Sequence, residues 1–427
     1  MSQQKPTKVR FFILFMVFIS VVINYMDRSN LSIAGPHIAA DFGLSTIEMG
    51  YIYSAFGWTY AFLQIPGGLI VDKVVPRVLY TVMLVGWSAM TILMGVAQGF
   101  LALFGLRLAV GVFEVPSFPT NNKVVTAWFP EHEKGKAIAI YTSGQFVGVA
   151  FLTPVLVAIQ NWIGWQGMFI LMGLIGVVWG IVWYMLYRQP DEHARANKEE
   201  IEYIRAGGGI IPSAKTGKSP KQKIDWSQVK MAFSRRKLWG VYIGQFASTS
   251  MLWFFLTWFP TYLVQYRHLD FIKVGFLTSI PFLEAFAGVL LGGTFSDWLI
   301  KRGHSITLAR KLPIILGLLL STSIVGANFT DNTTLIVCFM TLAFFGNGFS
   351  SITWTLISAI APVKAIGVTG GTFNFIGNLS SIVIPIVIGY LVSGGNFAPA
   401  LIFVSSVALI GALSYIFVVG KVERISL

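Results

Sequence analysis

The chain has 427 residues, of which 55% are apolar and only 11% are charged. Soluble domains carry about a quarter charged residues, so this composition excludes a soluble globular protein, and it equally excludes a disordered chain, which needs low hydrophobicity. The formal net charge of +13 indicates basic loops at a membrane surface rather than a nucleic-acid partner. The single cysteine, Cys338, excludes an intramolecular disulfide framework and a cysteine-based metal cluster.

Twelve stretches are long and apolar enough to cross a membrane as helices, which takes about 20 residues each. The first contains Asp27 and Arg28 and is too long for a signal peptide, so we expect an uncleaved span. The sequence therefore predicts an all-α integral membrane protein with twelve transmembrane helices. In chain order, the expected spans are 11–33, 47–71, 78–98, 99–120, 137–160, 165–187, 238–263, 274–298, 312–328, 333–360, 365–392 and 397–420.

The basic residues indicate the orientation of these spans. All but four of the 31 Lys and Arg residues fall in the two termini and in the connections that follow spans 2, 4, 6, 8 and 10. Lys and Arg concentrate in cytoplasmic loops. We therefore expect both termini and these connections in the cytoplasm.

The longest polar segment separates six spans from six spans. Its acidic cluster around Glu200 is expected to form a short surface helix, and its Lys-rich stretch from Lys215 to Lys230 is attributed to topology and to attraction to lipid headgroups. The expected units are an N-terminal six-helix bundle at 1–187, a cytoplasmic linker at 188–237 and a C-terminal six-helix bundle at 238–427.

The two halves carry similar signals. Gly68 and Asp72, followed by Arg77, end span 2, and Gly293 and Asp297 end span 8 with the same spacing. Internal repeats are typical of secondary transporters, whose substrate sites lie near the membrane midplane between the repeats.

Six plus six spans with a glycine–acid–basic loop after span 2 resemble the major facilitator superfamily. Val75 departs from that pattern, because the superfamily usually has glycine there. Asp72 can pair with Arg77 or another cytoplasmic arginine and so latch the halves in one state. A loop salt bridge without any gating role is the alternative.

Five ionisable residues fall within the expected spans: Asp27, Arg28, Arg107, Glu114 and Glu284. Each costs about 2.5–3.5 kcal/mol at a helix centre, so such residues usually face a cavity and pair. Arg107 and Glu114 are seven residues apart and share a helix face. We expect Asp27 to face Arg107, with Arg28 and Glu114 toward the central cavity.

The chemistry of these groups suits coupled transport of an anion. Arg28 presents a permanently charged planar fork that matches a carboxylate. Removal from water favours the protonated form of a carboxylic acid, which makes Glu114 the first and Asp27 the second candidate to carry a proton. A purely structural ion pair is the alternative, above all for Arg107. Glu284 has no basic neighbour in sequence, and a cavity-lining role, a polar partner and a third proton site stay open for it.

Polar and aromatic side chains around these charges suit a sugar-like ligand, because amides and hydroxyls bind several hydroxyls and rings pack on C–H surfaces. Gln145 and Asn374 hold equivalent places in the two halves. For tryptophans such as Trp87, packing or interfacial anchoring is the ordinary role. The candidate substrate-binding residues are Tyr25, Tyr60, Gln145, Ser351, Trp354 and Asn374, together with Arg28.

Several strings are similar to the anion:cation symporter family, and together they most resemble its bacterial D-galactonate transporters. The strings are NYMDR at 24–28, FEVPSFP at 113–119, AWFP at 127–130, YTSGQF at 141–146, GNG at 346–348 and ITW at 352–354.

This resemblance implies a proton-coupled importer of a sugar-acid anion, D-galactonate first, in the bacterial inner membrane. It also implies that Arg28 binds the substrate carboxylate, that the polar set contacts the polyol, that Asp27 and Glu114 take protons, and that Arg107 pairs with Asp27. A symporter or exchanger for another organic anion, such as glucarate, a hexuronate or tartrate, is the alternative.

We expect a monomer in the lipid bilayer, with protons as the coupling ions and with no cofactor, metal or nucleic-acid partner. A membrane enzyme is disfavoured because no nucleophile–base pair is evident, and a sensor because no segment is long enough for an output domain.

Overall fold

The computed structural model describes residues 5–210, 226–362 and 365–425, and all regular elements within these ranges are helical. The N-terminal half comprises α1 (Val9–Phe42), α2 (Thr46–Phe62), α3 (Gln64–Lys73), α4 (Pro76–Met94), α5 (Gly99–Glu114), α6 (Ser117–Trp128), α7 (Glu131–Ala150) and α8 (Leu152–Leu186). Two short helices follow, α9 (Lys198–Ala206) and α10 (Trp226–Ser234). The C-terminal half comprises α11 (Arg236–Thr257), α12 (Phe259–Thr261), η1 (Tyr262–Tyr266), α13 (Phe271–Lys301), α14 (Ile306–Ser321), η2 (Thr322–Phe329), α15 (Thr333–Phe349), η3 (Ser350–Ile352), α16 (Thr353–Ile360), α17 (Ile366–Asn378), α18 (Ser380–Leu391) and α19 (Ala398–Phe417).

These helices account for the expected spans. Within the described residues, nine helical segments are long and apolar enough to cross a membrane. One of them, Glu131–Leu186, has 56 residues and bends at Gly164, whose φ of 75° lies in the left-handed region and separates two expected spans. The consecutive helices α2–α3 and α11–α12 cover the remaining expected spans. The all-α fold is thereby confirmed, and the arrangement is consistent with twelve crossings.

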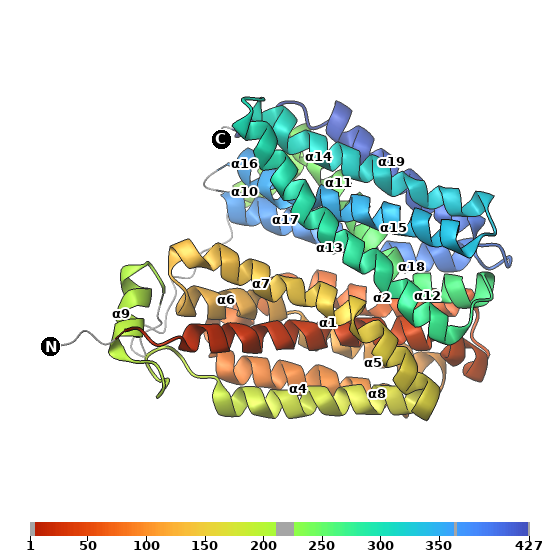
Figure 1. Ribbon diagram of the computed structural model, residues 1–427, viewed down its shortest axis with the longest axis horizontal. Coiled ribbons are helices and arrows are strands. Elements are labelled where there is room, and N and C mark those ends of the chain that lie inside the picture. Colours follow the sequence, from red (N-terminus) through yellow and green to blue (C-terminus); the bar gives the residue numbers. More distant parts are fainter. Residues whose placement is uncertain (1–4, 211–225, 363–364, 426–427) are drawn as a thin grey trace.

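The helices gather into two bundles that meet toward the end opposite the chain termini (Figure 1). There α2 packs against α18 at close range: a Cβ on Gly57 would lie 2.2 Å from Ser381 Oγ, and one on Gly50 would lie 2.7 Å from the Pro385 carbonyl oxygen. Thr46 Oγ1 also donates a hydrogen bond to the Gly389 carbonyl at 2.9 Å. Small residues let helix backbones approach closely in lipid, so glycine is required at this contact between the halves.

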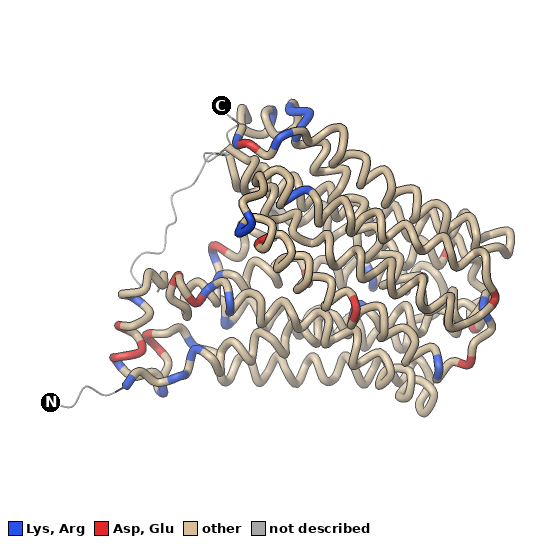
Figure 2. Tube along the Cα trace, turned by 45° about the horizontal axis from the view of Figure 1, so that its top comes forward, with Lys and Arg blue, Asp and Glu red and all other residues tan. Residues whose placement is uncertain are grey.

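Charged residues concentrate at the ends of the bundles, and Lys and Arg gather at the end that holds both termini (Figure 2). This distribution fits the basic loops expected on one membrane side.

Helix α9 docks onto the start of α1 through Glu200. The Glu200 carboxylate accepts hydrogen bonds from the Thr7 hydroxyl, from the backbone N–H groups of Val9 and Arg10 at 3.1 Å each, and from Arg10 Nη1 at 3.2 Å. A carboxylate at a helix N-terminus satisfies otherwise unpaired N–H groups. The expected short helix is present, but Glu200 is fully buried rather than at the surface. The expected Lys-rich stretch lies largely in 211–225, outside the described residues.

Candidate functional site

Arg28 of α1 and Glu114, the last residue of α5, form an ion pair inside the N-terminal bundle. Arg28 Nε donates a hydrogen bond to Glu114 Oε2 at 2.9 Å, and Arg28 Nη2 lies 2.9 Å from the same oxygen. The Glu114 side chain is fully buried and that of Arg28 is 6% exposed. The structure therefore brings together the two residues expected at the cavity, as partners of one another.

Three aromatic rings surround the Arg28 guanidinium. Its Cζ lies 4.8 Å from the ring centroid of Tyr25, 4.7 Å from that of Phe56 and 5.0 Å from that of Tyr60. Such contacts stabilise a buried cation. Tyr25 and Tyr60 were expected near Arg28, whereas Phe56 was missed; its place one helical turn before Tyr60 was the available signal.

The guanidinium is not saturated by these contacts. Arg28 Nη2, although close to Glu114, makes no hydrogen bond of good geometry within the described residues. Because an arginine carries five N–H donors in a fixed fork, the site can offer donors to an anion that enters beside Glu114.

Asp27 and Arg107 meet in a way that differs from the sequence expectation. Arg107 Nη1 donates to the main-chain carbonyl of Asp27 at 3.3 Å and Nη2 to that of Arg28 at 3.4 Å. The Asp27 carboxylate instead accepts the indole N–H of Trp87 at 3.0 Å and a longer bond from Asn30 at 3.5 Å. The expected side-chain pair is therefore wrong for this arrangement, because the α1 carbonyls accept from both Nη groups of Arg107 and Trp87 donates to the acid.

Trp87, for which packing or interfacial anchoring was expected, contacts the Asp27 carboxylate. It is fully buried, and a buried indole N–H usually has a hydrogen-bond acceptor. Its burial in α4 opposite α1 could not be read from the hydropathy of span 3 alone.

Four polyol candidates remain: Gln145, Ser351, Trp354 and Asn374. Within the described residues, none of the four forms a hydrogen bond with Arg28 or Glu114. Asn374 of α17 donates to Gln64 Oε1 of α3 at 2.7 Å and so joins the two halves. Trp354 is half-exposed and packs edge-on against Phe373, with 4.8 Å between ring centroids. The other two, Gln145 of α7 and Ser351 of η3, are partly buried.

The loop after α3 does not form the expected Asp72–Arg77 pair. Arg77 Nε donates to the Tyr184 carbonyl at 2.8 Å, and its guanidinium lies 4.1 Å from the Tyr184 ring centroid. Within the described residues no arginine pairs with Asp72, which together with Lys123 lines a cavity of about 540 Å³. Val75 is extended, with φ −65° and ψ 137°, so the glycine usual at this position is not needed. In the second half the equivalent acid, Asp297, does pair with an arginine, Arg310, at 3.3 Å.

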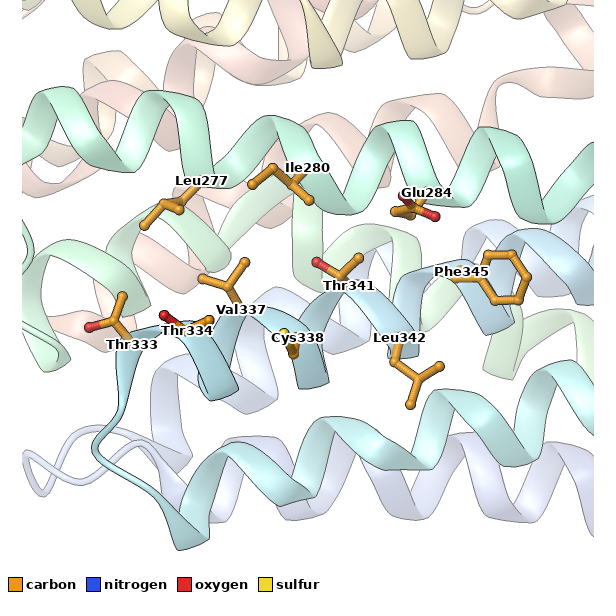
Figure 3. Close-up of a pocket in the computed structure, with 10 residues that line it drawn as sticks. All are labelled: Leu277, Ile280, Glu284, Thr333, Thr334, Val337, Cys338, Thr341, Leu342 and Phe345. Atoms are coloured by element: carbon orange, nitrogen blue, oxygen red, sulfur yellow. The ribbon is translucent and has the colours of Figure 1, made fainter.

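Glu284 lies in a different region from the buried charges. It lines a groove of about 500 Å³ between α13 and α15, together with residues that include Cys338 and Thr341 (Figure 3). It is exposed and takes part in no ion pair in the part of the chain that the structure describes. Within that part, no group of three or more His, Cys, Asp or Glu side chains is placed to hold a metal ion.

The fold and these contacts are those of a membrane protein built from two helical bundles around buried charges. Residues 17–385 match the profile of the Major Facilitator Superfamily. The chain belongs to this superfamily.

Curated relatives cover nearly the whole chain. It is 52% identical to a D-galactonate transporter of Escherichia coli over 99% of this chain and 98% of that one. It is also 44% identical to a probable galactarate/D-glucarate transporter of Escherichia coli, over 100% of this chain and 98% of that one. A Bacillus subtilis protein named probable galactarate/D-glucarate transporter is 42% identical over 99% of this chain and 94% of its own length.

The fold also matches a solved structure. A bacterial homolog of the human lysosomal transporter Spinster superposes with a TM-score of 0.75 at 17% identity, covering 97% of each chain.

Proposed function

We propose that this protein is a secondary active transporter that couples the uptake of a sugar-acid anion, D-galactonate first, to protons. The observation that carries the proposal is the buried Arg28–Glu114 pair, a fixed cation with a neutralisable counter-charge. The near-full-length identity of 52% to a D-galactonate transporter supports the substrate. Intramembrane ionisable residues are functional by default.

The substrate carboxylate binds Arg28 in this account. Protonation of Glu114 removes the counter-charge and frees the guanidinium fork for the incoming anion. Tyr25 and Tyr60, which already contact the guanidinium, then flank the bound carboxylate, and the polyol extends toward Gln145, Ser351, Trp354 and Asn374.

Coupling follows from this competition for one cation. An anion that enters without a proton is repelled by the Glu114 carboxylate, which already occupies Arg28. When a proton enters as well, Glu114 becomes neutral and the substrate carboxylate pairs with Arg28. A ligand pair reorients the protein only if it favours one state over the other. Asp27, which precedes Arg28 on α1, is the second proton site, and the indole N–H of Trp87 donates to its carboxylate.

Alternating access uses the contact between the bundles. The halves are joined at the end opposite the termini, where α2 meets α18, which corresponds to an inward-facing state if both termini are cytoplasmic. We place the protein as a monomer in the bacterial inner membrane with that orientation, and we assign it no enzymatic activity, metal or cofactor other than protons.

Labelled D-galactonate uptake into proteoliposomes under an inward-directed proton gradient tests the proposal. We expect gradient-stimulated uptake that unlabelled D-galactonate inhibits and glucarate or glucuronate does not. Gradient-independent uptake would favour an exchanger instead of a symporter.

A galactarate/D-glucarate transporter is the second candidate, because two relatives at 44% and 42% identity carry that name. Stronger inhibition by galactarate or glucarate than by D-galactonate would favour it.

A further inference from the structure

Buried polar side chains without partners in the described residues occur in the N-terminal bundle near Glu114, on α1 and at the start of α6. Both amide atoms of Asn24 and of Asn121, and the Ser117 hydroxyl, make no hydrogen bond in the described residues. None of the three side chains is more than 2% exposed. Buried polar groups are normally hydrogen-bonded, to protein or to ordered water, so three neighbouring exceptions require an explanation.

The Glu114 carboxylate has one oxygen without a partner in the described residues. Arg28 takes Oε2, whereas Oε1 is buried and has no partner. The Asn24 amide lies next to this carboxylate without a hydrogen bond of good geometry. On α6, Ser117 and Asn121 are one helical turn apart, about 6 Å along the axis, and they step away from Glu114 toward the end that holds the termini.

The series reaches an exposed residue. The Tyr80 hydroxyl of α4 lies near Ser20 of α1 and Asn121 of α6, and near the Tyr141 side chain. The Tyr141 hydroxyl donates to Asn122 Oδ1 at 2.6 Å, and Asn122 is exposed. We call this series the polar file and define it as Asn24, Ser117, Asn121, Tyr80, Tyr141 and Asn122.

Phe118 stands between Tyr25, which contacts Arg28, and Tyr141 of the polar file. The Tyr25 ring packs edge-on against Phe118 at 6.4 Å between centroids, and Phe118 packs against Tyr141 at 6.5 Å. On the other side of Glu114 stands the fixed positive charge of Arg28, which repels a proton moving in that direction.

We propose that the polar file holds internal water and conducts the coupled proton from Glu114 to the surface at Asn122, apart from the substrate path. One proton leaves the Glu114 carboxyl at Oε1, passes along O–H groups of water, Ser117 and Tyr80, and enters bulk water. The carboxylate that remains is neutralised by Arg28, ready to displace the anion. This inference rests on the proposed function, in which Glu114 carries the coupled proton.

Three variants test the path with small changes of shape: Tyr80→Phe and Ser117→Ala, which each remove one hydroxyl, and Asn121→Leu. The matched control is Thr120→Val. Thr120 lies on α6 with Ser117 and Asn121 and is fully buried, but its hydroxyl donates to the Pro116 carbonyl one turn earlier at 2.7 Å.

Two transport assays on each variant separate proton release from substrate handling. Exchange of labelled for unlabelled D-galactonate at equal pH needs no net proton release, whereas gradient-driven net uptake does. We expect net uptake to fall about tenfold in the variants, equivalent to about 1.4 kcal/mol in the barrier and to one lost hydrogen bond. Exchange should stay within about twofold, a change of no more than about 0.4 kcal/mol, and Thr120→Val should match the wild type in both assays.

Net uptake at the wild-type level in all three variants would overturn the path. A parallel fall of exchange and net uptake would also overturn it, because that pattern indicates a structural role. If the wild-type protein itself exchanges D-galactonate but shows no gradient-driven uptake, the proposed proton coupling fails instead.

Discussion

Replacing Glu114 with glutamine tests the competition for Arg28. The variant keeps the shape of the side chain and removes the charge that lies 2.9 Å from the guanidinium. At an effective dielectric constant of about 20, two unit charges at that distance interact by about 6 kcal/mol. If about a quarter of this energy opposes anion binding in the wild type, the variant binds D-galactonate about tenfold more tightly.

The same substitution removes the group that we propose carries the proton. Glu114→Gln should therefore exchange D-galactonate across proteoliposomes but fail to accumulate it under a proton gradient. Without substrate its melting temperature should fall, because a buried Arg28 without its partner costs about 3–5 kcal/mol. Added D-galactonate should raise the melting temperature of the variant by more than it raises that of the wild type.

Glu284→Gln is the matched control, since it neutralises a carboxylate in the groove between α13 and α15, away from Arg28. Exchange and accumulation should both stay at the wild-type level in this control. Gradient-driven accumulation by Glu114→Gln, or weaker D-galactonate binding than in the wild type, would refute the reasoning.

Three further substitutions probe neighbouring contacts. Arg28→Lys keeps the charge but loses the planar fork, so D-galactonate affinity measured by calorimetry should fall about 10- to 100-fold; unchanged affinity would place the carboxylate elsewhere. Trp87→Phe removes the N–H bonded to Asp27 and should destabilise the protein by about 1–3 kcal/mol, seen as a lower melting temperature, which an unchanged temperature would contradict. Glu200→Ala removes the acceptor of the first N–H groups of α1 and one of the two carboxylates that pair with Arg10, the other being Glu133, and should cost about 1–3 kcal/mol; a melting temperature equal to that of the wild type would show that α9 docks without this carboxylate.

The fold was predictable because hydropathy reports directly on membrane crossing. Each expected span coincides with one helix or with two or three consecutive helical elements, and the internal similarity between the halves anticipated the two bundles. The kink at Gly164 falls in the expected connection between spans 5 and 6. The break at Leu63 between α2 and α3 was not predictable, because an uninterrupted apolar stretch does not reveal backbone dihedral angles.

The buried charges were predictable as a group but not partner by partner. The cost of a charge in lipid singles out five residues. The structure buries four of them, Asp27, Arg28, Arg107 and Glu114, in the N-terminal bundle, whereas the fifth, Glu284, is exposed on α13. Which atoms meet depends on helix rotation by a fraction of a turn. An arginine can satisfy its donors on main-chain carbonyls as well as on a carboxylate, so sequence spacing did not distinguish the observed Arg107 contacts from the expected pair with Asp27.

Residues outside the charged set were harder to predict for a related reason. Asn24, Ser117 and Asn121 are polar residues within apolar spans, so the sequence alone does not single them out. Only the structure shows that they are buried on the neighbouring helices α1 and α6 without hydrogen-bond partners in the described residues. In the sequence Glu200 is one of several acidic residues expected at the surface, and only the docking of α9 onto the start of α1 buries it.

Substrate-driven proton movement is the most direct measure of proton coupling in this protein. Proteoliposomes loaded with a pH-sensitive dye, at equal pH inside and outside and with the membrane potential clamped, receive D-galactonate externally. The account predicts that the interior acidifies with the wild-type protein and does not with Glu114→Gln. Entry of labelled D-galactonate through the wild-type protein without any acidification would contradict proton coupling.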